Sequence, residues 1–165
     1  MIVVSNAGPL IALARIHRLD ILPALYGEIH VPSAVWEEIV EAGHETRAGT
    51  TELGSAKWIR RENIKDAIAV EVLGERLDAG ESESIVLGLE LRADVLLIDE
   101  ERGRRIAVAR GLNVIGTLGM LVLARQRGLV PSVALLLDKL IAAGFRMSAD
   151  LYRAVLTLTG ETPSE

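Results

Sequence analysis

The chain has 165 residues and a net charge of −5; half of its residues are hydrophobic, 3% are aromatic and none is cysteine. This length suits one domain with a single aliphatic core, and the lack of cysteine excludes disulfide bonds and thiolate metal sites and is typical of a cytoplasmic protein. The negative charge argues against a surface that binds nucleic acid by positive charge alone, and no apolar run approaches the ~20 residues of a membrane-spanning helix.

The first third of the chain alternates short β-branched runs with helical patterns. Ile2–Val4 predicts a buried strand that ends in a polar turn, and Pro9 fits the first turn of the following helix. This N-terminus has no basic stretch, so we expect no signal peptide. Helices are expected over 10–18, 19–26 and 34–41, and a strand over 28–31. Residues 43–56 are polar and rich in Gly and Thr, which indicates a loop or a frayed helix.

The rest of the chain continues the alternation. The clearest buried strand is Val95–Ile98, which ends at Asp99. Shorter strands are expected over 58–60, at a sheet edge, and 113–115, and helices over 63–73, 81–91, 101–110, 118–127, 132–143 and 149–159. Such alternation, with continuously hydrophobic strands, is typical of a doubly wound sheet. We therefore predict one three-layer α/β/α domain over 1–160, with a mostly parallel sheet of four to five strands, the C-terminal helices of 132–159 included, and a tail over 161–165.

Polar side chains follow three of the expected strands, at Asn6, Asp99 and Thr117. Ligands of open α/β sheets bind beyond the carboxyl ends of the strands, near the point where the strand order reverses. This edge is therefore the candidate site. Asp99 also has a purely structural interpretation, because Asp is a favoured N-cap for the helix that follows it.

Further carboxylates are candidates to converge with Asp99. Glu38 lies near the boundary of the apolar face of its helix, and Glu81 and Glu83 open a helix, where acidic residues also serve simply to complement the helix dipole. Several carboxylates in one cleft call for a cation, and oxygen ligands favour Mg²⁺ or Mn²⁺. The three histidines lack the spacing of zinc ligands, and the chain has no nucleophile elbow, P-loop or dinucleotide fingerprint.

Four short motifs, in this order, resemble those of PIN domains. They are VVSNAGPLI at 3–11, VPSAVWEEI at 31–39, GESESI at 80–85 and LID at 97–99. The stretches 99–105 and 116–119 are similar to a prokaryotic PIN branch of uncharacterised proteins related to VapC toxins. The resemblance implies a metal-dependent ribonuclease that acts on RNA, often as the toxin of a toxin–antitoxin pair with a small antitoxin protein as partner.

The resemblance also implies which residues form the site. The catalytic positions fall on Asn6, Glu38, Glu81 and Asp99, which would hold one or two Mg²⁺ or Mn²⁺ ions, with Glu83 as the alternative to Glu81. The family usually has Asp where this chain has Asn6, and an Asn oxygen binds Mg²⁺ without adding negative charge. We therefore expect weakened metal binding and a less activated water.

Basic residues near Asp99 are candidate RNA contacts. Arg105, about one and a half turns past Asp99, is expected to reach back toward the cleft, and Thr117 lies at the neighbouring strand end. The other arginines of 101–110 are better explained as a solvated face paired with acidic residues. The C-terminal helices carry more apolar surface than a solvated cover requires, which indicates core packing or, alternatively, a homodimer or antitoxin interface.

Two alternative functions stay open. One keeps the fold and weakens the chemistry at Asn6, which leaves a module that binds nucleic acid or protein. The other is a receiver-like domain in which Asp99 is phosphorylated and Thr117 responds. Against the latter, the first strand lacks the acidic pair that would hold Mg²⁺, and no Lys follows a last core strand.

Overall fold

The computed structural model describes residues 1–44 and 50–163. Within this part, five strands form one parallel sheet in the order β3-β2-β1-β4-β5. The strands are β1 (Val3–Ser5), β2 (Ile29–Pro32), β3 (Ile59–Glu62), β4 (Val95–Leu97) and β5 (Val114–Ile115). Helices flank the sheet, so the predicted three-layer α/β/α fold is confirmed, and β3 is the edge strand expected near 58–60.

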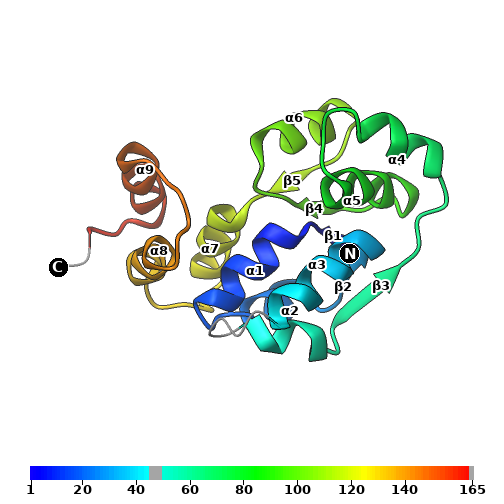
Figure 1. Ribbon diagram of the computed structural model, residues 1–165. Helices are drawn as coiled ribbons and strands as arrows, with labels where there is room; N and C mark the ends of the chain where they lie inside the picture. Colours follow the sequence, from blue (N-terminus) through cyan, green and yellow to red (C-terminus); the bar gives the residue numbers. More distant parts are fainter. Residues whose placement is uncertain (45–49, 164–165) are drawn as a thin grey trace.

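Helices cover both faces of the sheet (Figure 1). They are α1 (Ala7–Arg15), α2 (Ile21–Tyr26), α3 (Ser33–His44), the 3₁₀ helix η1 (Thr50–Ser55), α4 (Ala67–Leu73), α5 (Ala79–Glu90), α6 (Glu101–Ala109), α7 (Thr117–Gln126), α8 (Val133–Ala142) and α9 (Ala149–Thr159). Successive strand residues point to opposite faces. Accordingly Val3 and Leu97 enter the core under α1, α3 and α7, whereas Val4 and Leu96 enter the core under α5 and α6.

Two expected helices begin elsewhere because an aspartate caps each of them. The helix expected over 63–73 begins only at Ala67, since the Asp66 side chain accepts a hydrogen bond from the Ala69 N–H at 3.0 Å. The helix expected from Glu81 begins earlier, at Ala79, after Asp78. The loop expected over 43–56 lies partly outside the described residues; in the rest of it, α3 runs to His44 and η1 covers Thr50–Ser55.

The strand order reverses between β1 and β4. The chain adds β2 and β3 on one side of β1, then crosses back and adds β4 and β5 on the other side. Connections that leave neighbouring strands in opposite directions open a crevice at the carboxyl edge of the sheet. Asn6 and Asp99 follow these two strands, and the Asn6 N–H donates to the Leu97 carbonyl at 2.9 Å. The two strand ends are therefore held side by side.

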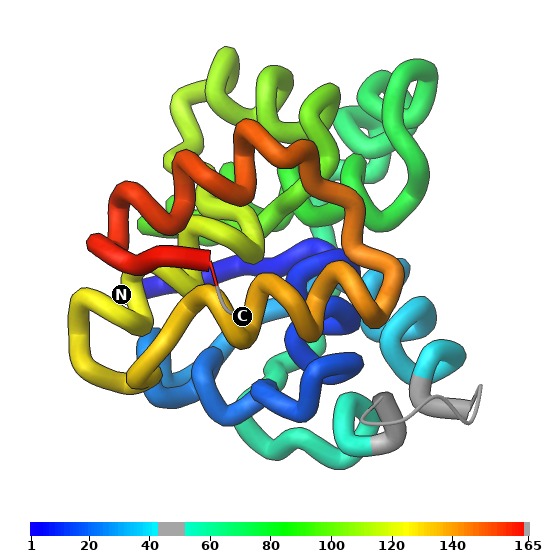
Figure 2. Tube along the Cα trace, turned by 90° about the vertical axis from the view of Figure 1, so that its left-hand side faces the viewer, coloured from blue at the N-terminus to red at the C-terminus, as the bar shows by residue number. Residues whose placement is uncertain are grey.

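The pair α8–α9 packs on α7 and α1 and covers one end of the domain (Figure 2). Its inward residues belong to the core shared with the sheet: Leu136, Leu137, Leu140, Val155 and Leu156. After α9 the chain returns to α8, where the Glu161 carboxylate accepts a hydrogen bond from the Val133 N–H at 2.9 Å. In the described part of the chain, none of the helices combines the length and the apolar character needed to cross a bilayer.

Candidate active site

Three side-chain oxygens converge beside Gly80, in the first turn of α5. A methyl group placed on Gly80 would lie 3.2 Å from Asn6 Oδ1 and 3.4 Å from Glu38 Oε1. The same position lies 3.6 Å from Asp78 Oδ1. The start of α1, the middle of α3 and the start of α5 thus bring one amide and two carboxylates to a common point, and the lack of a side chain at Gly80 keeps that point clear.

Asn6 is the buried member of this group, with an exposed fraction of 8%. It occupies the N-cap position of α1, yet its side chain makes no capping hydrogen bond there. A capping Asn normally turns its oxygen back to the helix N–H groups. Here the oxygen lies 3.2 Å from the position that a methyl group on Gly80 would take, which Glu38 and Asp78 also approach.

Glu81 is buried next to this point, and its environment opposes its negative charge. Burial raises its pKa to about 7, assisted by the hydrogen bond and the charge of Asp78 and by the charge of Glu100. Gly103 gives the side chain room, because a methyl group there would lie 3.0 Å from Glu81 Oε2. Glu38 is shifted in the same direction: partial desolvation raises its pKa, and the charges of Asp78 and Glu41 add to the effect.

Asp99 is held by the first residue of α7. Its Oδ1 accepts from the Thr117 N–H and its Oδ2 from the Thr117 hydroxyl, both at 2.7 Å. Asp99 therefore does not cap α6, whose N-cap residue is Glu100. Because β4 and β5 are neighbours, the carboxylate after β4 faces the start of the helix after β5. Gly116 permits this approach, since a methyl group there would lie only 2.8 Å from Asp99 Oδ1.

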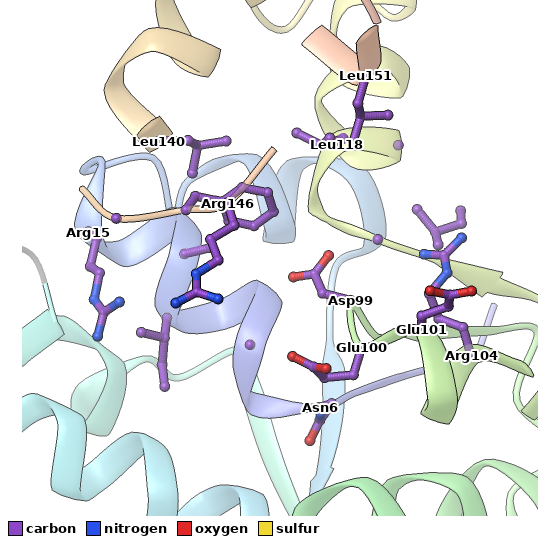
Figure 3. Close-up of a pocket in the computed structure, with 18 of the residues that line it drawn as sticks. Asn6, Arg15, Asp99, Glu100, Glu101, Arg104, Leu118, Leu140, Arg146 and Leu151 are labelled. Carbon is purple, nitrogen blue, oxygen red and sulfur yellow. The ribbon is translucent and has the colours of Figure 1, made fainter. Parts of the chain in front are cut away.

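A cleft of about 860 Å³ opens beside Asp99, between α1, α6, α7 and the α8–α9 connection. Asn6, Asp99 and Glu100 line it at the strand ends, and Arg146 of the α8–α9 connection lies across from them (Figure 3). Arg15 and Arg104 also line the cleft, and its apolar wall includes Leu118, Leu140, Phe145 and Leu151. The cleft thus combines carboxylates, arginines and aliphatic groups around one open space, an arrangement suited to a ligand with both anionic and apolar parts.

The donor set suits a hard divalent cation in its chemistry, because carboxylate and amide oxygens are ligands of Mg²⁺ and Mn²⁺. It is nevertheless short of charge. Among the described residues, no group of three or more His, Cys, Asp or Glu side chains is placed to hold a metal ion. Beside Gly80 the negative charge is low because one of the three oxygens there belongs to Asn6, whose side chain is neutral.

The family model DUF3368, described as a PIN domain, matches residues 2–161. The chain belongs to the PIN-domain family. The predicted resemblance is therefore confirmed, and with it a nuclease-type fold whose members generally depend on a divalent metal and act on nucleic acid. Neither the curated proteins nor the solved structures compared with the chain give a match. Membership in this family leaves no support for the receiver-like alternative.

Three of the residues expected to form the PIN site meet beside Gly80, whereas Asp99 and Glu83 make other contacts. Asn6 and Glu38 converge at Gly80, and Glu81 joins them through Asp78. The contacts of Asp99 are with Thr117 and with the backbone around Gly8 and Gly116. Glu83, the alternative to Glu81, accepts a hydrogen bond from the Ala34 N–H at 3.1 Å. Its side chain therefore binds a free N–H group in the first turn of α3.

The two expected RNA contacts of this PIN domain are placed differently from the expectation. Thr117 is fully buried, and its hydroxyl donates a hydrogen bond to the Asp99 carboxylate. Thr117 therefore positions that carboxylate. Arg105 is exposed beside a separate hollow on α6. Arg104 lies on the main cleft instead and donates to the Ile98 carbonyl at 3.1 Å. The face of α6 that lines the main cleft therefore carries Arg104 and not Arg105.

Sequence reasoning missed Asp78 and Arg146. Asp78 carried a local signal, because Asp three residues before Glu is a common helix N-terminal pattern, and its Oδ1 indeed accepts from the Glu81 N–H at 2.8 Å. Arg146 carried none. It follows α8 by four residues, and only the packing of α8–α9 on α1 and α7 brings it to the cleft.

Proposed function

We propose that the chain is a PIN-type ribonuclease that hydrolyses RNA phosphodiester bonds with Mg²⁺ or Mn²⁺. The observation that carries this proposal is the convergence of Asn6, Glu38 and Asp78 oxygens beside Gly80, with Glu81 buried next to them. This group lies where the strand order reverses, at the edge that α/β folds use for ligands. Membership in the PIN family supports nuclease chemistry there.

The roles follow from position and charge. Asn6, Glu38 and Glu81 would hold the cation, which supplies activation of a water molecule and offsets the charge of the scissile phosphate. Asp99, oriented by two hydrogen bonds from Thr117, presents a fixed carboxylate at the same strand edge. Arg146 lies across the cleft from Asp99, and Arg104 lies beside Asp99; both line the cleft and would bind RNA phosphates.

The finer assignment is a cytoplasmic toxin that is neutralised by a small antitoxin and that forms a homodimer. It is supported by the similarity of residues 99–105 and 116–119 to the branch related to VapC toxins. The exposed apolar residues of α8–α9 offer a surface for such a partner: Leu135, Ile141, Leu151 and Leu158. Light scattering on the purified chain tests the dimer.

Restoring a carboxylate at position 6 tests the ribonuclease proposal. We expect Asn6→Asp to raise the rate of Mn²⁺-dependent cleavage of an end-labelled single-stranded RNA by about tenfold or more, because one more charged ligand strengthens metal binding. Adding Glu38→Gln to that variant should abolish the gain. Asn63→Asp adds the same charge away from Gly80 and should leave the rate at the wild-type level.

A second candidate function is favoured by the lack, among the described residues, of three acidic side chains placed around one metal position. On that observation the wild-type chain is a nucleic-acid-binding module with a weakened site. RNA binding without cleavage by the wild type, together with cleavage by Asn6→Asp, would support this second function. An Asn6→Asp variant that neither cleaves RNA nor binds Mn²⁺ in calorimetry would refute the nuclease proposal.

A further inference from the structure

We propose that Asp78 is a further ligand of the cation site and supplies the negative charge that Asn6 lacks. This inference rests on the proposed function, because it concerns the same site. Asp78 lies outside the four catalytic positions that the family resemblance implies, so the inference comes from geometry alone.

The first observation is the position of the Asp78 carboxylate. Its Oδ1 is 3.6 Å from the point beside Gly80 that Asn6 Oδ1 and Glu38 Oε1 also approach. Asp78 and Glu38 are both exposed, so a hydrated cation can reach their oxygens without crossing the core. Two carboxylates and one amide oxygen then face the same position.

The second observation is the state of Asn6. Its side chain is nine-tenths buried, and among the described residues it takes part in no hydrogen bond, although it occupies a helix N-cap. Its oxygen approaches the same position beside Gly80 as the Glu38 and Asp78 carboxylates. Carboxylates repel an amide oxygen but would share a cation with it. A cation held among these three oxygens satisfies the amide and both carboxylates together.

Capping alone does not use up the Asp78 side chain. The carboxylate interacts with the Glu81 N–H, which donates to its Oδ1 at 2.8 Å, and with the Glu81 side chain. An ionised carboxylate offers about four lone pairs, so oxygen positions remain for a cation. The chain contains a natural comparison in Asp66, which caps α4 in the same way by accepting from the Ala69 N–H at 3.0 Å. Asp66 is not among the groups that surround Gly80, so it isolates the effect of capping.

Mn²⁺ affinity of the full chain, measured by calorimetry and by the electron paramagnetic resonance signal of free Mn²⁺, tests the proposal without reference to activity. Asp78→Asn keeps an N-cap acceptor and removes the charge. We expect it to weaken Mn²⁺ binding by about tenfold or more, and Asp66→Asn to leave the affinity within about twofold. The double variant Asn6→Asp/Asp78→Asn has the wild-type number of charges around Gly80 and should recover most of the lost affinity.

Thermal unfolding of the two Asn variants controls for damage to α5, and Asp78→Ser, which also retains a cap, serves if Asp78→Asn does not fold. Equal Mn²⁺ affinities of Asp78→Asn, Asp66→Asn and the wild type would assign Asp78 to capping alone and overturn this inference while the proposed function stands. Absence of Mn²⁺ binding by both the wild type and Asn6→Asp would overturn the proposed function and this inference together.

Discussion

At the scale of single residues, Glu81 makes the stability of the fold depend on pH. Burial and the neighbouring Asp78 and Glu100 raise its pKa from about 4.5 to about 7. Between these values the folded chain holds a proton that the unfolded chain has released, so the free energy of unfolding falls as the pH rises through this window and is level above it. We expect a loss of about 1–2 kcal/mol, allowing for solvent screening, in urea unfolding at about pH 5 and pH 7.5.

Glu81→Gln has no titrating group at this position and should remove most of that pH dependence. Glu71→Gln, an exposed change on α4, should leave it intact. Glu38, whose pKa is raised in the same direction, accounts for the remaining slope. An unaltered slope in Glu81→Gln would show that the titrating group is another residue.

At the scale of elements, the Asp99–Thr117 pair joins the end of β4 to the start of α7. Thr117→Val keeps the N–H bond to Asp99 and removes the hydroxyl that donates to Oδ2. We expect it to lower the free energy of unfolding by about 1 kcal/mol, because a partly buried carboxylate oxygen loses its donor. RNA cleavage should fall as well, since Asp99 is no longer fixed by two bonds.

Thr157→Val is the matched control for this change. The Thr157 hydroxyl also donates a hydrogen bond, to the Arg153 carbonyl at 2.9 Å, but it lies on the exposed face of α9. Its loss should alter the free energy of unfolding by less than about 0.5 kcal/mol and leave cleavage unchanged. Similar losses of cleavage in both variants would argue against a role for Thr117 in positioning Asp99.

Helices and strands could be predicted from the sequence wherever the local pattern of hydrophobic residues determines them. Continuous aliphatic runs such as Val95–Leu97 predict buried strands, and the rule that ligands bind at the carboxyl ends of parallel strands led to Asn6 and Asp99. Pairings between distant elements were not predictable. The bond from Thr117 to Asp99 depends on β4 lying beside β5, and the approach of Asp78 to Asn6 depends on α5 packing beside β1. No local pattern encodes those contacts.

At the scale of the whole molecule, α8 shares its core with the sheet, which predicts that residues 1–160 unfold as one domain. Leu137 is fully buried, whereas Leu135 on the same helix is 56% exposed. Leu137→Ala should lower the free energy of unfolding by about 2–5 kcal/mol in a single transition, and Leu135→Ala should change it by less than about 0.5 kcal/mol. A separate early transition in Leu137→Ala, with the rest melting as the wild type does, would identify α8–α9 as an independent unit.

The central claim is that the oxygens beside Gly80 hold the divalent cation of a PIN-type nuclease. The most direct measurement is an anomalous difference map from crystals of the full chain soaked in Mn²⁺. We expect a Mn²⁺ peak beside Gly80 that is coordinated by Asn6, Glu38, Glu81 and Asp78. A map without a peak at that position, or with Mn²⁺ bound only elsewhere on the chain, would contradict it.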